Sequence, residues 1–320
     1  MKSIKQTTTI EQAAKILSDK NKIALFAHTN PDGDTIGASI SLKLALEKIG
    51  KTVNVFCDSK LDGRISCFDE TRTVSQAFNG KYDLLVAVDC GDIFRVGEFS
   101  QEYFDFGETM TIDHHGGEFF SKYNCLKPYA STCQIVYEII KESGIEIDGK
   151  LATYLYMGLC TDTGNFAHNN TDGECFDMAG NLFRCGADIE KVYRTFFRDT
   201  TLSETKLQAR VVSRIRSYYD GQMFLIYVTK ADLDEFGLDP SITSGIVSYA
   251  IDIDTAKVGV CVCEFAKNDY KVSMRGKNCS VRDICAEFGG GGHLYAAGCK
   301  ISGFLEDVIE KIVRAVGYSI

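Results

Sequence analysis

The 320-residue sequence has few prolines, no low-complexity tract and no long apolar run, and each absence excludes a class of protein. With three prolines, 45% hydrophobic and 25% charged residues, its composition is that of a globular chain and excludes disordered, collagen-like and fibrous proteins. No uncharged apolar run approaches the roughly 18 residues that a membrane-spanning helix needs. Residues 1–17 have the pattern of an amphipathic helix and not of a signal peptide, so we expect a cytoplasmic protein without a membrane partner.

The sequence also lacks a Cys-x-x-Cys pair, although it contains thirteen cysteines. At these ordinary spacings a chain of this length is not built on a zinc or disulfide framework. We therefore expect reduced thiols in the protein core, which agrees with a reducing compartment.

A basic stripe is absent, and the formal net charge is −9. Binding along a long nucleic acid depends on neutralising phosphates with Lys and Arg, so this charge argues against such a partner. A short anionic substrate held by metal ions remains compatible with it.

Strand and helix patterns alternate in the first half of the chain. Short apolar runs bounded by polar or turn residues predict buried strands at 22–27, 52–56, 82–88 and 109–112. Apolar residues at spacings of three and four predict helices at 35–49, 131–143, 151–159 and 174–185. The alternation predicts an α/β domain with a parallel, doubly wound sheet, in which ligands bind at the carboxyl ends of the strands.

The second part of the chain has a different pattern. Residues 199–220 are polar, have helical periodicity and contain neither Pro nor Gly to break a helix. They predict a helical linker between domains 1–198 and 221–320. After it we expect a smaller mixed α/β domain. Its predicted elements are a strand at 223–228, helices near Ala231 and Ser241, a hairpin-like pair at 257–265 and 270–274, and a helix from Leu305.

Acidic and histidine side chains follow the predicted strands. The clusters are His28, Asp32 and Asp34 after the first strand, Asp89 after the third, Asp113, His114 and His115 after the fourth, and Asp162 after an apolar helix. Pro31 and Gly33 predict a tight turn that points the two carboxylates of the first cluster in different directions. Each cluster has a simpler interpretation, since Asp32 and Asp34 are also typical turn and N-cap residues. Their meeting at one sheet edge favours a metal site.

The residue types of this site predict its chemistry. Oxygen-rich sites with some imidazole suit Mn²⁺ or Mg²⁺, and pairs of such ions are typical of phosphoester hydrolysis. Adjacent histidines on an extended segment point to opposite sides, so one of His114 and His115 can bind metal while the other faces substrate. Asp113 can orient an imidazole from behind.

A glycine-rich segment in the second domain contains the remaining candidate site. Gly289 to Gly292 precede His293, and backbone amides of such loops can approach an anion closely. Arg275 and Lys277 follow a predicted strand. A flexible turn and a solvated edge are the simpler interpretations of these two features.

With these motifs the sequence resembles the DHH phosphoesterase family, in its two-domain branch with a DHH-associated C-terminal domain. The segments HTNPDGDTIGAS, VAVDCGD, TIDHHGG, TDTGNF and GGGGHLYAAG stand in the order of the family and cover nearly the whole chain. Within the family, the sequence is similar to the bifunctional oligoribonucleases, or nano-RNases, that also remove the 3′-phosphate from 3′-phosphoadenosine 5′-phosphate. The resemblance implies a catalytic α/β domain and a smaller substrate-binding domain.

The resemblance also implies a role for each motif residue. Two divalent cations are expected, Mn²⁺ first and Mg²⁺ or Co²⁺ as alternatives, one held by His28, Asp32 and Asp89 and the other by Asp34, Asp89, His114 and Asp162. Asp113 would support an imidazole and His115 would face the phosphate as a hydrogen-bond donor or acid. The substrate would be held by Arg275, Gly290, Gly291, Gly292 and His293. The chain departs from the family at Gly276, where serine is frequent, and at His168-Asn169-Asn170, and the role of His168 stays open.

These implications define an expected function with alternatives. We expect a metal-dependent phosphodiesterase that cuts short RNA or dinucleotides to 5′-mononucleotides and dephosphorylates nucleoside bisphosphates, and a homodimer is compatible with the sequence. A phosphodiesterase for cyclic or linear dinucleotides shares every motif. A family II pyrophosphatase lacks the glycine–histidine loop, and a processive exonuclease normally needs a further domain. A non-catalytic nucleotide-binding regulator would usually lack a ligand that is present here.

Overall fold

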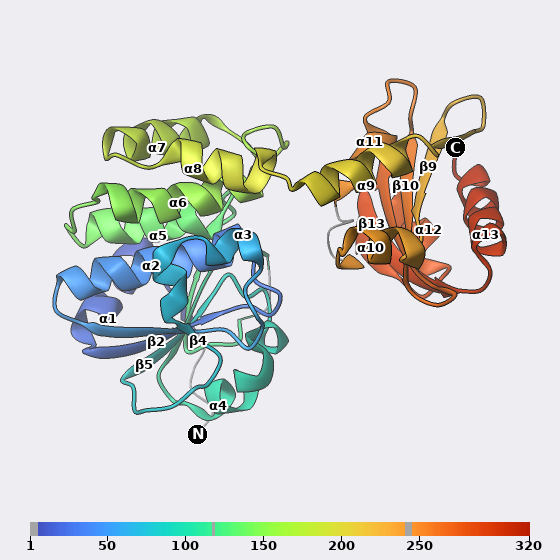
Figure 1. Cartoon of the computed structure of the whole chain (residues 1–320). Helices are drawn as coiled ribbons and strands as arrows, with labels where there is room; N and C mark the ends of the chain where they lie inside the picture. Colours follow the sequence, from blue (N-terminus) through green and yellow to red (C-terminus); the bar gives the residue numbers. More distant parts are fainter. Residues whose placement is uncertain (1–5, 117–118, 241–244) are drawn as a thin grey trace. The chain divides into compact units, whose positions relative to one another are not determined.

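The computed structural model describes residues 6–116, 119–240 and 245–320. The chain divides into two compact units, Met1–Asp199 and Thr200–Ile320, and each unit is built around its own sheet (Figure 1). Among the described residues, no helix combines the length and apolar character needed to cross a membrane.

The first unit contains a seven-stranded sheet in which every neighbouring pair is parallel. Its order is β1-β7-β6-β5-β2-β3-β4, which confirms the predicted parallel α/β architecture. The bounds are β1 (Gln6–Thr7), β2 (Lys22–Ala27), β3 (Thr52–Phe56), β4 (Val74–Ser75), β5 (Leu84–Val88), β6 (Thr109–Asp113) and β7 (Tyr123–Leu126). The sequence patterns missed β1, β4 and β7, because runs of two to four residues are too short to show a period.

Helices cover both faces of this sheet. The main layer on one face comprises α1 (Ile10–Asp19), α2 (Gly33–Lys48), α5 (Thr132–Glu142) and α6 (Gly149–Asp162). Figure 1 shows α7 (Gly173–Arg184) and α8 (Ile189–Tyr193) packed on the far side of α6, away from the sheet. The short α3 (Gly63–Ser66) follows β3, and η2 (Ile93–Phe99) with α4 (Ser100–Asp105) covers the other face. Alternate strand residues therefore enter different cores: Ile23 and Leu25 of β2 pack under the main layer, whereas Phe26 packs with Phe99 and Tyr103.

Glycines allow α2 and α6 to approach each other closely. A Cβ atom on Gly33 would lie 2.5 Å from Thr161 Oγ1, and one on Gly37 would lie 2.5 Å from the Tyr154 carbonyl oxygen. On the α6 side, a Cβ atom on Gly158 would lie 2.5 Å from Asp34 Oδ1. Because no side chain separates the helices here, the start of α2 and the end of α6 meet at the edge of the sheet.

The second unit contains a six-stranded mixed sheet with the order β12-β13-β11-β10-β9-β8. Within this second sheet, as far as its residues are described, only the β9–β10 pair is parallel. The strands are β8 (Arg216–Tyr218), β9 (Met223–Val228), β10 (Val258–Ala266), β11 (Asp269–Gly276), β12 (Gly291–His293) and β13 (Ala296–Ser302). The predicted mixed α/β character is thus confirmed.

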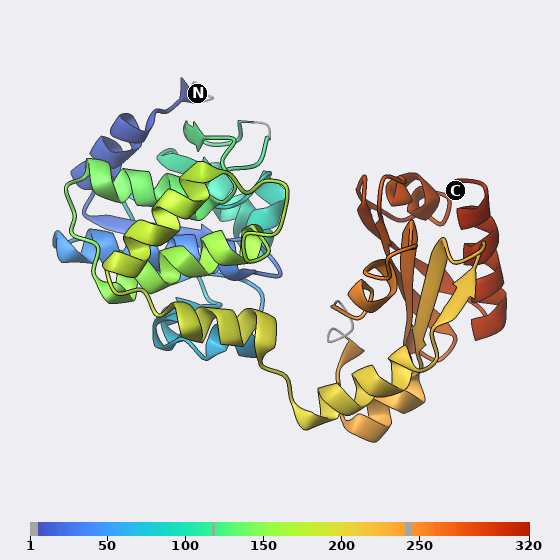
Figure 2. The same cartoon turned by 90° about the horizontal axis from the view of Figure 1, so that it is seen from above.

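Helices also pack on both faces of the second sheet. They are α9 (Leu202–Val212), α10 (Lys230–Phe236), α11 (Ser248–Ile251), α12 (Val281–Ala286) and α13 (Leu305–Gly317). Figure 2 shows α13 along one face, where Val308 and Ile312 enter the core, while Leu207 and Leu233 pack on the opposite face. The helix predicted near Ser241 falls outside the described residues.

The segment 199–220 differs from the single helix predicted for it. Helix α9 ends at Val212, and Arg216–Tyr218 forms β8, which pairs with the neighbouring strand β9 in antiparallel register. The periodicity missed this strand because three mainly polar residues show no apolar alternation. Both elements belong to the second unit, whose first residue is Thr200.

The close contact between α2 and α6 yields a first prediction. Gly158→Ala places a methyl group 2.3 Å from Cys133 Sγ and 2.5 Å from Asp34 Oδ1, so Asp34 must move. We expect unfolding free energy to fall by about 1–3 kcal/mol, as for overpacked cores, with loss of metal binding at Asp34. Urea unfolding and metal titration provide the measurements.

Gly173→Ala is the matched control, because a Cβ atom there has no heavy atom within 4 Å. We expect this variant to keep wild-type stability and metal binding. Normal metal binding in Gly158→Ala would show that the glycine contact does not position Asp34.

Candidate metal centre

Three predicted site residues lie at the carboxyl ends of neighbouring strands in the first unit. His28 follows β2, Asp89 follows β5, and Asp113 ends β6, and these three strands are neighbours in the sheet. Parallel strands end at the same edge, so their terminal side chains must meet there. Asp34 in the first turn of α2 and Asp162 at the end of α6 reach the same edge through the α2–α6 contact.

Asp89 lies at the centre of the cluster, with one oxygen facing each of two histidines. His28 Nε2 lies 3.4 Å from Asp89 Oδ2 and 3.5 Å from Asp32 Oδ2. On the other side, His114 Nε2 lies 3.6 Å from Asp89 Oδ1 and 3.3 Å from Asp162 Oδ2. Among the described residues, the donor atoms form three overlapping groups that could each hold a metal ion: His28 with Asp32 and Asp89, Asp34 with His114 and Asp162, and Asp89 with Asp113, His114 and His115.

The backbone turns sharply at Asp89. Its φ of 61° is left-handed, a conformation that aspartate adopts more readily than bulky residues do. The side chain is nevertheless buried, at 2% exposure, directly after the last residue of β5. A strained backbone at a buried carboxylate is typical of a functional site.

Carbonyl groups orient both histidines that flank Asp89. His28 Nδ1 donates to the Thr29 carbonyl at 2.8 Å, and His114 Nδ1 donates to the Tyr129 carbonyl at 3.0 Å. A carbonyl oxygen only accepts, so each Nδ1 carries a proton and each Nε2 is directed into the cluster. Within the described part of the chain, both Nε2 atoms are buried and have no hydrogen-bond partner, as expected for metal ligands.

The charges of the cluster are uncompensated without a cation. Burial, followed by repulsion from Asp34 and other carboxylates, raises the pKa of Asp162 to about 10. The same two causes raise the pKa of Asp34 well above its usual value. Burial opposes protonation of His28, but its contacts with Asp32 and Asp89 outweigh it and raise its pKa to about 9. Without metal the site therefore holds protons that divalent cations would replace.

Asp32 has both of the roles predicted for it, because one carboxylate oxygen caps helix α2 and the other faces the cluster. Its Oδ1 accepts hydrogen bonds from the backbone amides of Asp34 and Thr35, at 3.0 and 3.1 Å, at the start of α2. Its Oδ2 is the oxygen near His28. The cap thus fixes one oxygen and aims the other into the cluster.

Thr132 at the start of α5 is a contact that the sequence patterns missed. Its amide donates to Asp34 Oδ2 at 2.6 Å, and its hydroxyl donates to Asp89 Oδ1 at 2.8 Å. The Cys133 amide donates to Asp34 Oδ1 at 3.0 Å. Free amides at a helix N-terminus favour a carboxylate, so α5 holds two acidic residues of the cluster. The Ser-Thr pair at the start of the predicted helix was the available signal.

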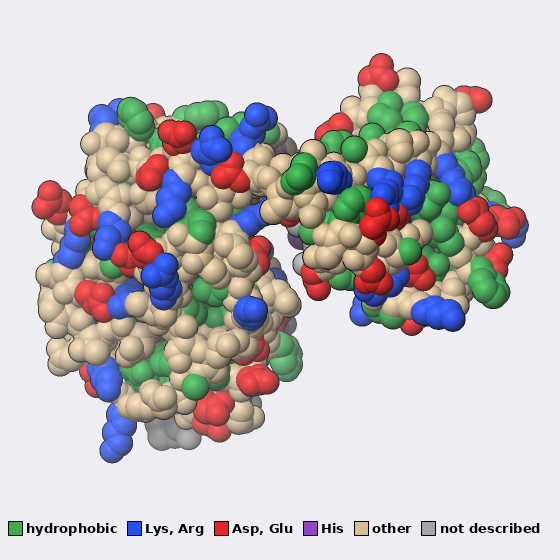
Figure 3. Space-filling model, viewed as in Figure 1, with side chains coloured by type: hydrophobic (Ala, Val, Ile, Leu, Met, Phe, Trp, Pro, Cys, Tyr) green, Lys and Arg blue, Asp and Glu red, His purple; other side chains and the backbone are tan. Residues whose placement is uncertain are grey.

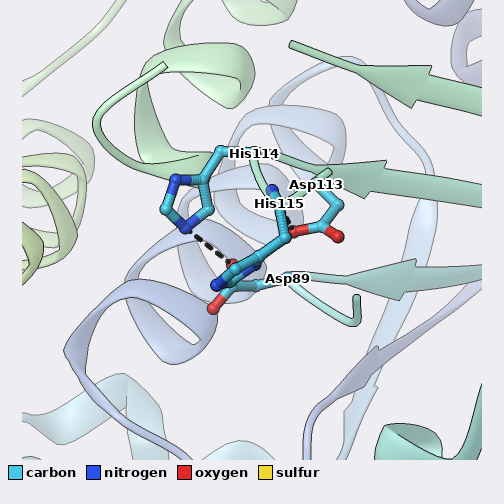
Figure 4. Close-up of side chains that lie close together, drawn as sticks. All are labelled: Asp89, Asp113, His114 and His115. Carbon is cyan, nitrogen blue, oxygen red and sulfur yellow. Dashed lines mark hydrogen bonds and ion pairs between the residues drawn. The ribbon is translucent and has the colours of Figure 1, made fainter. Parts of the chain in front are cut away.

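His114 and His115 do not point to opposite sides, contrary to the expectation for an extended segment. Their ring centroids are 4.2 Å apart, because β6 ends at Asp113 and the pair lies in a bend (Figure 4). Asp113 Oδ1 accepts from His115 Nδ1 at 2.8 Å and from the His115 amide at 3.1 Å. Asp113 therefore supports His115, whose side chain is 45% exposed at the rim of the cluster.

His168 does not join the cluster but lies behind it. Its Nδ1 is 3.3 Å from the Asp162 carbonyl oxygen, to which Asn170 Nδ2 also donates at 3.2 Å. Asn170 Nδ2 contacts the Ala130 carbonyl as well, at 3.2 Å. The departure from the family pattern thus supports the backbone at Asp162.

The candidate substrate-binding residues lie together in the second unit. Arg275 of β11 and His293 of β12 are both register partners of Ala296 on the intervening strand β13. Register partners project to the same face, so the guanidinium and imidazole side chains flank a small alanine. Arg275 Nη1 donates a hydrogen bond to the carbonyl oxygen of the preceding residue, Met274, at 3.0 Å. The His293 side chain is exposed.

Close packing accounts for several of the glycines in this region. A Cβ atom on Gly290 would lie 2.2 Å from the Gly298 carbonyl oxygen, and one on Gly292 would lie 2.6 Å from that of Ala296. Gly291 has no heavy atom within 4 Å of its Cβ position, so it leaves open space. At Gly276 a Cβ atom would lie 2.2 Å from the Cys279 carbonyl oxygen, which accounts for the absence of the family's serine.

Comparisons with known proteins agree with this geometry. Residues 22–159 match the N-terminal domain of the DHH family, and residues 220–319 match the DHHA1 domain. The chain is 30% identical over 304 residues to the bifunctional oligoribonuclease and PAP phosphatase NrnA of Thermus thermophilus, covering 92% of this chain and 89% of that protein. The chain belongs to the DHH family. With its histidine–carboxylate cluster, this DHH protein is a metal-dependent phosphoesterase.

Two further relatives match this DHH protein over nearly its whole length. The bifunctional oligoribonuclease and PAP phosphatase NrnA of Mycoplasma genitalium is 27% identical over 319 residues, covering 95% of this chain and 98% of that protein. A crystal structure of an exopolyphosphatase-related protein from Bacteroides fragilis is 25% identical, with a TM-score of 0.89 over 97% of this chain and 95% of that one.

The contacts of Thr132 yield a second prediction. Thr132→Val keeps the shape and the amide donor but removes the hydroxyl that donates to Asp89. We expect metal affinity and turnover to fall by about 10- to 100-fold, as typically follows when a hydrogen-bond partner of a metal ligand is lost. Metal titration and steady-state kinetics measure the two effects.

Thr132→Ser keeps the hydroxyl and is expected to restore most of the affinity. Equal losses in the valine and serine variants would assign the effect to packing and contradict a role for this hydrogen bond.

Proposed function

We propose that this DHH protein hydrolyses short oligoribonucleotides to 5′-mononucleotides and also removes the 3′-phosphate from 3′-phosphoadenosine 5′-phosphate. The observation that carries this proposal is the position of Asp89, whose two oxygens face two separate histidine–carboxylate groups. Such a shared carboxylate is what a pair of cations acting on one phosphate needs. The two relatives named NrnA carry both activities in their names.

The cluster fits two divalent cations, for which we propose Mn²⁺, with Mg²⁺ or Co²⁺ as alternatives. His28, Asp32 and Asp89 would hold one, and Asp34, Asp89, His114 and Asp162 would hold the other. When bound, such cations lower the pKa of a water molecule and stabilise charge on a phosphoryl group. Carboxylate and imidazole donors without thiolates suit Mn²⁺ and Mg²⁺ better than soft metals.

The chain's own side chains would orient the substrate. Asp113 holds Nδ1 of His115, which leaves the half-exposed imidazole in a fixed direction at the rim of the cluster. His115 can thus donate a hydrogen bond to a phosphoryl oxygen or to the departing oxygen. In the second unit, Arg275 and His293 flank Ala296 and would bind the distal phosphate and base of the substrate, with Gly290 to Gly292 lining that place.

The charge of the surface favours short substrates. Figure 3 shows Lys and Arg side chains interspersed with Asp and Glu on the visible face of each unit. Three arginines of the second unit are paired with acids: Arg210 with Glu235, Arg214 with Asp232 and Arg216 with Glu306. Paired charges and a net charge of −9 offer little to phosphates outside the site.

The substrate panel supplies the third prediction. Labelled RNAs of graded length up to 24-mers, 3′-phosphoadenosine 5′-phosphate, cyclic dinucleotides and pyrophosphate are compared with Mn²⁺. We expect kcat/KM to be highest at about two to five nucleotides and to fall beyond, because longer RNAs gain no further phosphate contacts. Asp89→Asn, purified in parallel, excludes a contaminating nuclease.

Three results would contradict the proposal. Efficiency that rises steadily with length would indicate a longer binding track. Preference for a cyclic dinucleotide over every linear RNA would indicate second-messenger hydrolysis. No turnover of any phosphate ester would indicate a non-catalytic nucleotide-binding regulator.

A further inference from the structure

Arg95 lies in η2, and the loop that connects β5 to η2 borders the His115 side of the cluster. Gly91 of this loop packs against His115, since a Cβ atom on Gly91 would lie 3.7 Å from His115 Cβ. The Arg95 amide donates to Asp92 Oδ1 at 3.1 Å, and its carbonyl accepts from the Thr29 amide at 2.8 Å. Its backbone is therefore anchored on both sides, next to the segment that carries His28.

The Arg95 side chain has a charge without an acidic partner. Among the described residues, it forms no ion pair and no side-chain hydrogen bond, and its Nε is buried without an acceptor. The residue as a whole is half-buried, so its charge is only partly exposed to solvent. This contrasts with Arg214 and Arg216, each of which donates twice to a carboxylate.

We propose that Arg95 binds a non-bridging oxygen of the substrate phosphoryl group on the His115 side of the metal cluster. This inference rests on the proposed function, because it takes a phosphate ester as the substrate. A planar guanidinium offers parallel donors that match two phosphate oxygens, and it keeps its charge at every relevant pH. The residues around His28 and His114 would hold the cations, and Arg95 would contact the phosphate from the rim of the cluster.

The test compares Arg95→Ala and Arg95→Lys with wild type and with Arg184→Ala. Arg184 is an exposed residue of α7 that contacts Asn181 and lies outside the proposed site, so its variant controls for loss of one positive charge. For each protein, Mn²⁺ stoichiometry, kcat and KM on an RNA dinucleotide, and the affinity of the Mn²⁺-loaded protein for inorganic phosphate are measured.

We expect Arg95→Ala to lower kcat/KM and phosphate affinity by about 10- to 150-fold, the range for one hydrogen bond to a charged group. Mn²⁺ stoichiometry should stay at the wild-type value. Arg95→Lys should lose less, since it keeps the charge but not the planar donors. Arg184→Ala should match wild type.

Two outcomes would overturn the inference. The first is phosphate affinity and kcat/KM in Arg95→Ala within about twofold of wild type, far below the expected contribution of a charged hydrogen bond. The second is loss of Mn²⁺ from that variant, which would assign Arg95 to the metal cluster. If wild type fails to cut the dinucleotide, the proposed function fails, while phosphate affinity still decides the role of Arg95.

Discussion

The repulsion among buried carboxylates at the end of the central strands is the constraint on which the site depends. Asp34 and Asp89 are buried within the cluster, and Asp162 is partly buried beside them. Burial and mutual repulsion together hold protons on Asp34 and Asp162. The fold keeps such groups together because other parts of the chain hold each of them in place, and divalent cations would remove the repulsion.

Three local devices hold these carboxylates against their repulsion. Glycines on α2 and α6 bring Asp34 and Asp162 to one edge without intervening side chains. The left-handed backbone at Asp89 aims its two oxygens toward His28 and His114. The N-terminus of α5 donates two amides and a hydroxyl to the same acids. Each of these features either restricts the conformation of the chain or introduces backbone strain, as expected where a site is preorganised.

The sequence predicted the strands that end in site residues because those strands are buried on both faces. Lys22–Ala27 was predicted with its observed bounds, and the run predicted at 82–88 ends where β5 ends, since continuous apolar runs are typical of buried parallel strands. The bend at His114 and His115 was not predictable, because it depends on where β6 ends and not on local propensity. The hydrogen bond from Thr132 to Asp89 likewise joins segments that are far apart in the chain.

The most direct test of the central claim is a Mn²⁺ titration that counts tightly bound ions per chain in wild type and in Asp89→Asn. The account predicts two ions in wild type, because Asp89 faces two donor groups. It predicts that Asp89→Asn, which removes the shared charge, binds fewer ions or binds both far more weakly. A single ion in wild type, or two ions of unchanged affinity in Asp89→Asn, would contradict a bridged pair of cations.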